Sequence, residues 1–135
     1  MAEKDLQYGE KLNFEPGVRL YKPGDPIGQK PVFYIIAGLV KIEFKVADGS
    51  KFPLYLLPDS IFGLVEPLLN CPRLTAAYNM ERSLLYCWDM EGFDIASGVS
   101  WELALSSITG LTQMLRILNA EFGERIGLID DRILK

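Results

Sequence analysis

Hydrophobic and polar residues alternate in short runs along the first two thirds of the chain. The clearest run is Leu39–Val46, where Val40, Ile42 and Phe44 point to one face and charged residues to the other. This period of two is typical of a β-strand with one buried face. Shorter apolar runs predict the other strands: Val18–Tyr21, Val32–Ala37, Phe52–Leu57, Ile61–Phe62, Thr75–Met80 and Leu84–Trp88.

The residues between these runs favour turns. All eight prolines lie between Pro16 and Pro72, and Asp48-Gly49 is a strong hairpin signal. Pro53 lacks an N–H for strand pairing, so its strand is expected at a sheet edge. Short strands at this spacing predict a mainly β fold with C-terminal helices. We expect a jelly-roll (double-stranded β-helix) barrel of about eight strands over residues 12–90.

A helical pattern replaces the strand pattern after Trp88. Asp89 is placed to cap a short helix that ends near Ala96, and Ser100 to cap a long helix that reaches at least Phe122. Asp130-Asp131 then interrupts the pattern. We therefore expect a β-barrel domain with short flanking helices over residues 1–98, and a long helix over 99–129. Residues 130–135 would begin a further helix that leads to an absent domain.

The long predicted helix is poor in charge, since Arg116 is its only charged residue between Leu103 and Ala120. One apolar stripe can cover the β-domain, and the rest needs another partner. A second copy of the chain in a two-fold dimer would supply it; the alternative is a helix packed wholly inside one chain. The predicted dimer seam has a heptad-like spacing: Ile108, Leu111, Leu115, Leu118 and Phe122.

The composition excludes several chemistries. The chain has 135 residues, a net charge of −4 and no histidine, so triad catalysis, imidazole metal sites and histidine-ligated haem are ruled out. Two cysteines cannot fill a four-ligand metal site, and no nucleophile stands beside a base. No basic run is present, so this segment is not expected to bind nucleic acid directly. No secretion signal is visible, and we expect a cytoplasmic protein.

The order of the turn motifs resembles a known family. A Gly24-Asp25 turn, a strand ending in Ala37-Gly38 and the Asp48-Gly49 hairpin precede Phe62-Gly63 and a short helix. In this order they resemble the cyclic nucleotide-binding sensor domain of the cyclic-AMP receptor protein and FNR-like superfamily. The resemblance covers about residues 10–130, and the segment Gly63–Arg73 has the spacing of the family's phosphate-binding cassette.

The resemblance implies a set of ligand-binding residues. A glycine lets the backbone approach the ligand, helix N–H groups face an anion, and an arginine pairs with the phosphate. A structural salt bridge is the alternative role for the arginine. The implied residues are Gly63, Leu64, Val65, Arg73, Leu74 and Thr75.

Two positions depart from the family's pattern. The family has a ribose-binding glutamate directly after the glycine, where this chain has Leu64, and a small residue after the arginine, where it has Leu74. Glu66 is expected to point elsewhere. A lost charged acceptor costs about 1.5–3 kcal/mol, so we expect cyclic AMP to bind weakly. Cys71-Pro72 resembles a haem-responsive motif in two residues only, and no haem is expected.

The resemblance therefore implies the effector domain of a CRP/FNR-type transcription regulator. A small anionic effector, either a cyclic nucleotide or another anion, would bind in the barrel. The dimer helix would relay binding to a missing C-terminal DNA-binding domain. The alternative is a stand-alone regulatory or scaffold module that does not touch DNA. A cupin-type enzyme has no residue in its support, and we expect no enzymatic activity, no membrane association and no resident cofactor.

Overall fold

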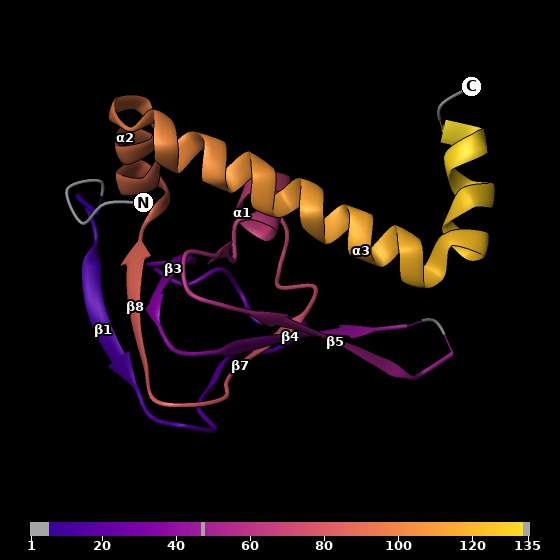
Figure 1. The fold of residues 1–135 in the computed structure, drawn as a ribbon, viewed down its shortest axis with the longest axis horizontal. Helices are drawn as coiled ribbons and strands as arrows, with labels where there is room; N and C mark the ends of the chain where they lie inside the picture. The colour runs from indigo at the N-terminus through magenta and orange to yellow at the C-terminus, as the bar shows by residue number, and fades with distance from the viewer. Residues whose placement is uncertain (1–5, 47, 134–135) are drawn as a thin grey trace.

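The described part of the chain forms eight antiparallel strands and three helices, arranged as Figure 1 shows. The computed structural model describes the backbone of residues 6–46 and 48–133, and the side chains of these residues up to 121. The elements are β1 (Glu10–Phe14), β2 (Arg19–Tyr21), β3 (Val32–Ala37), β4 (Val40–Lys45), β5 (Lys51–Leu56), β6 (Ile61–Phe62), α1 (Val65–Leu69), β7 (Ala76–Asn79), β8 (Ser83–Trp88), α2 (Met90–Val99) and α3 (Trp101–Ile133).

The strands form two four-stranded sheets, with the orders β1-β8-β3-β6 and β2-β7-β4-β5. The pairings are nested, since β1 pairs with β8, β2 with β7, β3 with β6 and β4 with β5. This is the strand order of a double-sheet jelly roll. The mainly β fold and the C-terminal helices are confirmed. The strands hydrogen-bond within two separate sheets, however, and not around a closed barrel.

Strand β1 was not among the runs that the sequence predicted individually. Its segment is mostly polar, and only Leu12 and Phe14 are partly buried. Strand β5 lies at the edge of its sheet, as Pro53 predicted. Strands β3 and β8 are buried on both faces: Phe33 and Ile35 face the core between the sheets, while Val32 and Tyr34 face the helices.

The two predicted helix caps are confirmed. The Gly92 N–H donates to the Asp89 carboxylate at 2.6 Å, and the Leu103 N–H donates to the Ser100 hydroxyl at 3.1 Å. The predicted break at Asp130-Asp131 is wrong, because the backbone stays helical to Ile133. None of the helices in the described part of the chain has the length and apolar character that a membrane span requires.

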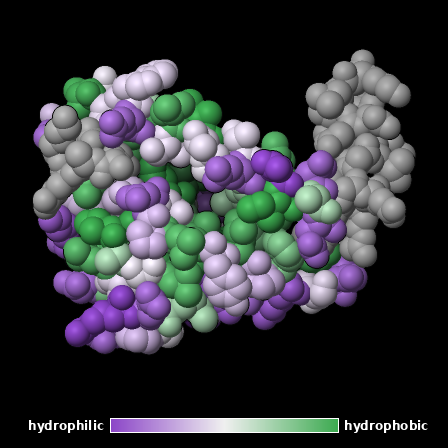
Figure 2. Space-filling view, in the orientation of Figure 1, coloured by the Kyte–Doolittle hydropathy of each residue, from purple (hydrophilic) through white to green (hydrophobic). Residues whose placement is uncertain are grey.

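Helix α3 crosses over both sheets, from the corner with α2 past α1 and towards the β4–β5 hairpin (Figure 1). Leu103 is fully buried against the outer face of the β1-β8-β3-β6 sheet, together with Trp88 and Phe93. Further along, Met114 packs against the core between the sheets. Figure 2 shows hydrophobic residues gathered where α3 lies over the sheets. Helix α3 therefore covers the β-domain.

Candidate functional site

A cavity of about 360 Å³ lies between α1, the β-sheets and α3. We call it the α1 cavity. Most of its wall is apolar: the strands contribute Ile42, Phe44 and Phe62, and α3 contributes leucines and Met114. The strands, the α1 segment and the loop after it supply its polar lining: Tyr21, Lys45, Glu66 and Thr75. A cavity of this size and lining is typical of a small-molecule site.

The start of α1 is set by a glycine. Gly63 has a φ of +82°, and a Cβ atom there would lie 2.3 Å from the Pro31 carbonyl oxygen. Any other residue would therefore clash with the backbone and strain the turn. This close approach brings the Gly63 and Pro31 carbonyls to the buried end of the cavity, where both accept hydrogen bonds from one arginine.

Arg73 and Glu66 form a buried ion pair at that end. The Arg73 Nη1 atom lies 2.9 Å from Glu66 Oε1, and both residues are 4% exposed. Arg73 also donates to the Gly63 oxygen at 2.9 Å and to the Pro31 oxygen at 2.8 Å, and its guanidinium carbon lies 4.0 Å from the centre of the Tyr21 ring. Glu66 Oε2 accepts from the Leu74 N–H at 3.3 Å. Both charges are thus satisfied within the chain.

Glu66, which was expected to point elsewhere, lies in the cavity wall beside Arg73. Helix α1 lasts one turn and ends at Asn70, whose left-handed φ of 54° reverses the chain. The Cys71 N–H then donates back to the Glu66 backbone carbonyl oxygen at 3.1 Å. This reversal returns Arg73 beside Glu66. The sequence did contain a signal for this pair, because a glutamate and an arginine stand on either side of a proline and an asparagine. The prediction considered only the family's glutamate position, directly after the glycine, and so missed it.

The structure brings together four of the six predicted ligand-binding residues. Gly63, Val65, Leu74 and Thr75 line the α1 cavity. Arg73 contacts Glu66 and is not part of the lining. Leu64 lies elsewhere. Its side chain is 5% exposed and packs in the core beneath α2 and α3, together with Phe93 and Leu103.

Tyr21 completes the polar end of the cavity. Burial, opposed by the Arg73 charge and assisted by the Glu66 charge, raises the pKa of Tyr21 to about 12. Its phenol therefore stays neutral at physiological pH. The polar end of the α1 cavity thus presents a paired carboxylate, a neutral phenol and a threonine hydroxyl.

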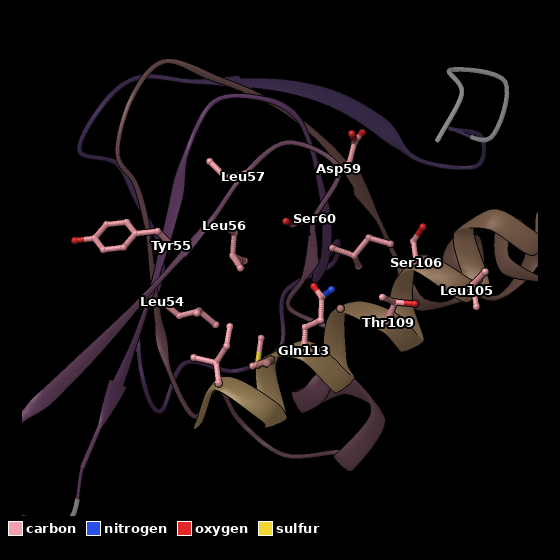
Figure 3. A pocket seen from close by; sticks show the side chains of 14 residues that line it. Leu54, Tyr55, Leu56, Leu57, Asp59, Ser60, Leu105, Ser106, Thr109 and Gln113 are labelled. Carbon is pink, nitrogen blue, oxygen red and sulfur yellow. The ribbon is translucent and has the colours of Figure 1, made fainter. Parts of the chain in front are cut away.

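A second hollow of about 410 Å³ lies between the β5–β6 connection and α3. We call it the β5 cavity. Figure 3 shows Gln113 and Thr109 on α3 and Ser60 on the opposite wall. Asp59, also in the lining, accepts a hydrogen bond from the Tyr34 hydroxyl. Met114, a flexible side chain on α3, lines both cavities.

The predicted seam residues divide between two faces of α3. Ile108 and Leu115 are 59% and 65% exposed, while Leu111 and Leu118 are partly buried and line the α1 cavity. Leu115 lies at the cavity's rim as well. The side chain of Phe122 lies outside the described residues.

Cys71 and Cys87 are both free, and they differ in burial. Desolvation raises the pKa of Cys87 to about 12, although nearby Lys30 opposes the effect. The thiolate is the reactive form. We therefore expect a disulfide reagent at pH 8 to label Cys71 in the native protein and Cys87 only after unfolding. Counting labelled thiols with and without denaturant checks this, and rapid labelling of Cys87 in the folded chain would contradict it.

The described residues hold no group of three or more His, Cys, Asp or Glu side chains that could bind a metal ion. No protein-family model matches the sequence, and no curated protein matches it.

Solved structures do match. The catabolite activator protein of Thermus thermophilus is 21% identical, with a TM-score of 0.71 over 91% of this chain and 59% of its own. A cAMP-binding acyltransferase from Mycobacterium smegmatis is 28% identical, with a TM-score of 0.58 over 68% and 28%. The N-terminal domain of a transcriptional regulator from Streptomyces coelicolor A3(2) is 18% identical, with a TM-score of 0.58 over 89% and 88%.

The chain has the fold of the cyclic nucleotide-binding domains, as its motifs predicted. It spans about three fifths of the length of the Thermus thermophilus protein.

Proposed function

We propose that this chain is the ligand-sensing effector domain of a CRP/FNR-type transcription regulator. The α1 cavity is the proposed effector site. The observation that carries the proposal is the position of this cavity: it is enclosed by the segment Gly63–Thr75, which the resemblance singled out, and by the long helix α3. The Streptomyces coelicolor neighbour, itself a transcriptional regulator domain of similar length, supports the same reading.

The cavity couples its contents to α3 directly. Leu111, Met114, Leu115 and Leu118 all contribute to its wall, and they occupy more than one turn of the helix. A molecule that fills the cavity therefore changes the packing of that stretch. A ligand shifts a conformational equilibrium only through such a difference in contacts between two states. Helix α3 is thus the proposed relay to a separate DNA-binding domain of a longer protein.

A second copy of the chain is the proposed partner of α3. Trp101, Leu105, Ile108 and Leu115 recur on one face of the helix in steps of three, four and seven, and they are between 47% and 75% exposed. A long apolar face of this kind is costly to leave in water. A two-fold pair of α3 helices would bury it, and it would place the two effector sites on either side of one shared seam.

An anionic effector, which the sequence favours, would have to break a protein contact to reach Arg73, because Glu66 occupies that guanidinium. Cyclic AMP meets the same obstacle, and Leu64 offers its ribose no acceptor.

Thermal-shift measurements with cyclic nucleotides and small organic compounds test the proposal, because a ligand of the folded state raises Tm by mass action. The matched variant is Val65→Trp, which fills the cavity from α1. We expect binding compounds to raise the Tm of the unaltered chain and not that of the variant, and cyclic AMP to have little effect on either. Shifts that all persist in Val65→Trp would contradict the proposed site.

A further inference from the structure

The cation that the α1 cavity would offer to an anion is already neutralised. The Arg73 guanidinium donates three hydrogen bonds, two to carbonyl oxygens and one to Glu66, and it stacks on the Tyr21 ring. It is absent from the lining, whereas Glu66 is part of it. A ligand in the cavity therefore meets the carboxylate first and the guanidinium only if Glu66 leaves.

At the polar end, the Glu66 carboxylate has unused capacity for accepting hydrogen bonds. A carboxylate has about four lone-pair positions, and Glu66 uses one on each oxygen, for Arg73 and for the Leu74 N–H. Thr75 adds a hydroxyl to the same wall. Lys45, a cation in the lining, is exposed, so solvent and salt screen its charge. The buried end thus repels an anion and receives a donor.

The remaining, apolar lining determines which kind of ligand fits the rest of the cavity. Ile42, Phe44 and Phe62 on the strands face Leu111 and Leu118 on α3 across the cavity. Such a wall offers no partner to a polar or charged molecular body, and it favours an apolar or aromatic one.

We infer that the effector is a small, mainly apolar molecule, neutral or cationic, which points an N–H or O–H donor at Glu66, and that the Glu66–Arg73 pair excludes anions from the cavity. This rests on the proposed function, in which the α1 cavity is the effector site. Glu66 is then the specificity-determining residue, because its charge decides which ligands enter.

Two fluorescent probes of the same skeleton test the inference. N-phenyl-1-naphthylamine is neutral and carries one N–H, while 1-anilinonaphthalene-8-sulfonate adds a negative charge. We expect the unaltered chain to bind the neutral probe at least tenfold more tightly than the sulfonate in fluorescence titrations. Val65→Trp is expected to abolish binding of the neutral probe, which locates it in the cavity.

We call the exclusion of anions by the Glu66–Arg73 pair the charge rule. It is tested by Glu66→Gln, which keeps the shape and one acceptor of the side chain and leaves the Arg73 charge unpaired. We expect this variant to bind the sulfonate at least tenfold more tightly than the unaltered chain, with little change for the neutral probe. The double variant Glu66→Gln/Arg73→Gln removes both charges and is the matched control. The double variant is expected to bind the sulfonate no more tightly than the unaltered chain does. It can still be measured if the single variant fails to fold.

The outcomes separate the two proposals. Equal binding of both probes by the unaltered chain, lost for both in Val65→Trp, overturns the charge rule and leaves the effector site standing. A gain for the sulfonate that persists in the double variant also overturns the charge rule. Absence of binding by the neutral probe, or binding that Val65→Trp leaves unchanged, overturns the effector site itself and with it the inference.

Discussion

Arg73→Met is expected to lower the free energy of unfolding by about 3–5 kcal/mol, the usual cost of breaking a buried ion pair from one side. The substitution leaves Glu66 as an uncompensated charge at 4% exposure. It also removes the donors that satisfy the Gly63 and Pro31 carbonyl oxygens. Urea denaturation followed by tryptophan fluorescence measures the change, since Trp88 lies in the adjacent core.

Two controls distinguish the cost of breaking the buried pair from the cost of removing an arginine at any position. Arg82 pairs with Glu15 at the same 2.9 Å distance, but both side chains are more than 60% exposed. Arg82→Met should therefore cost no more than about 1 kcal/mol. The double variant Arg73→Met/Glu66→Leu removes the unpaired charge and should recover much of the lost stability. Equal and small losses of unfolding free energy in Arg73→Met and Arg82→Met would show that the Glu66–Arg73 pair is not buried in solution.

The second large effect concerns the apolar face of α3. If this face is the seam between two copies, Ile108→Glu places two carboxylates opposite each other across the axis, where desolvated like charges cost several kcal/mol. We expect the unaltered chain to run as a dimer and the variant as a monomer, in size-exclusion chromatography with light scattering. Ile108 suits this test because it lines neither cavity.

Val18→Glu is the matched control for the seam. Val18 is a partly exposed apolar residue in the turn before β2, and the same change there adds the same charge. This variant should remain a dimer. Leu115→Glu should behave as Ile108→Glu does, and it should also disturb the α1 cavity, whose rim it shares. A dimer that survives both α3 substitutions would place the interface elsewhere.

The sequence predicted the fold well where local signals are strong. Alternation located β4, Asp48-Gly49 located its hairpin, and Asp89 and Ser100 located the starts of α2 and α3. It missed β1 because that strand is polar, and its place in the sheet comes from pairing with β8, at the far end of the β-domain. Propensity and periodicity do not report such long-range pairing.

The candidate site was predicted in outline and not in chemistry. The position of Gly63 and its close backbone approach followed from the motif, whereas the partner of Arg73 did not. That partner depends on a one-turn helix and on the left-handed Asn70, which together return the chain onto Glu66. Likewise, Leu64 was expected at the ligand, but the burial of its side chain beneath α2 and α3 is decided by helices that lie much later in the sequence.

The nested pairing of the strands also has a consequence for how the protein is made. Strand β1 pairs with β8, and the Gly9 N–H donates to the Tyr86 hydroxyl across a sequence separation of 77 residues. At about 5–20 residues per second, the ribosome needs roughly 4–15 seconds to synthesise that interval. Throughout this time β1 has no partner, and the innermost β4–β5 hairpin is the first pair that can close. The β-domain is therefore completed from the hairpin outwards, and its first strand is the last to be paired.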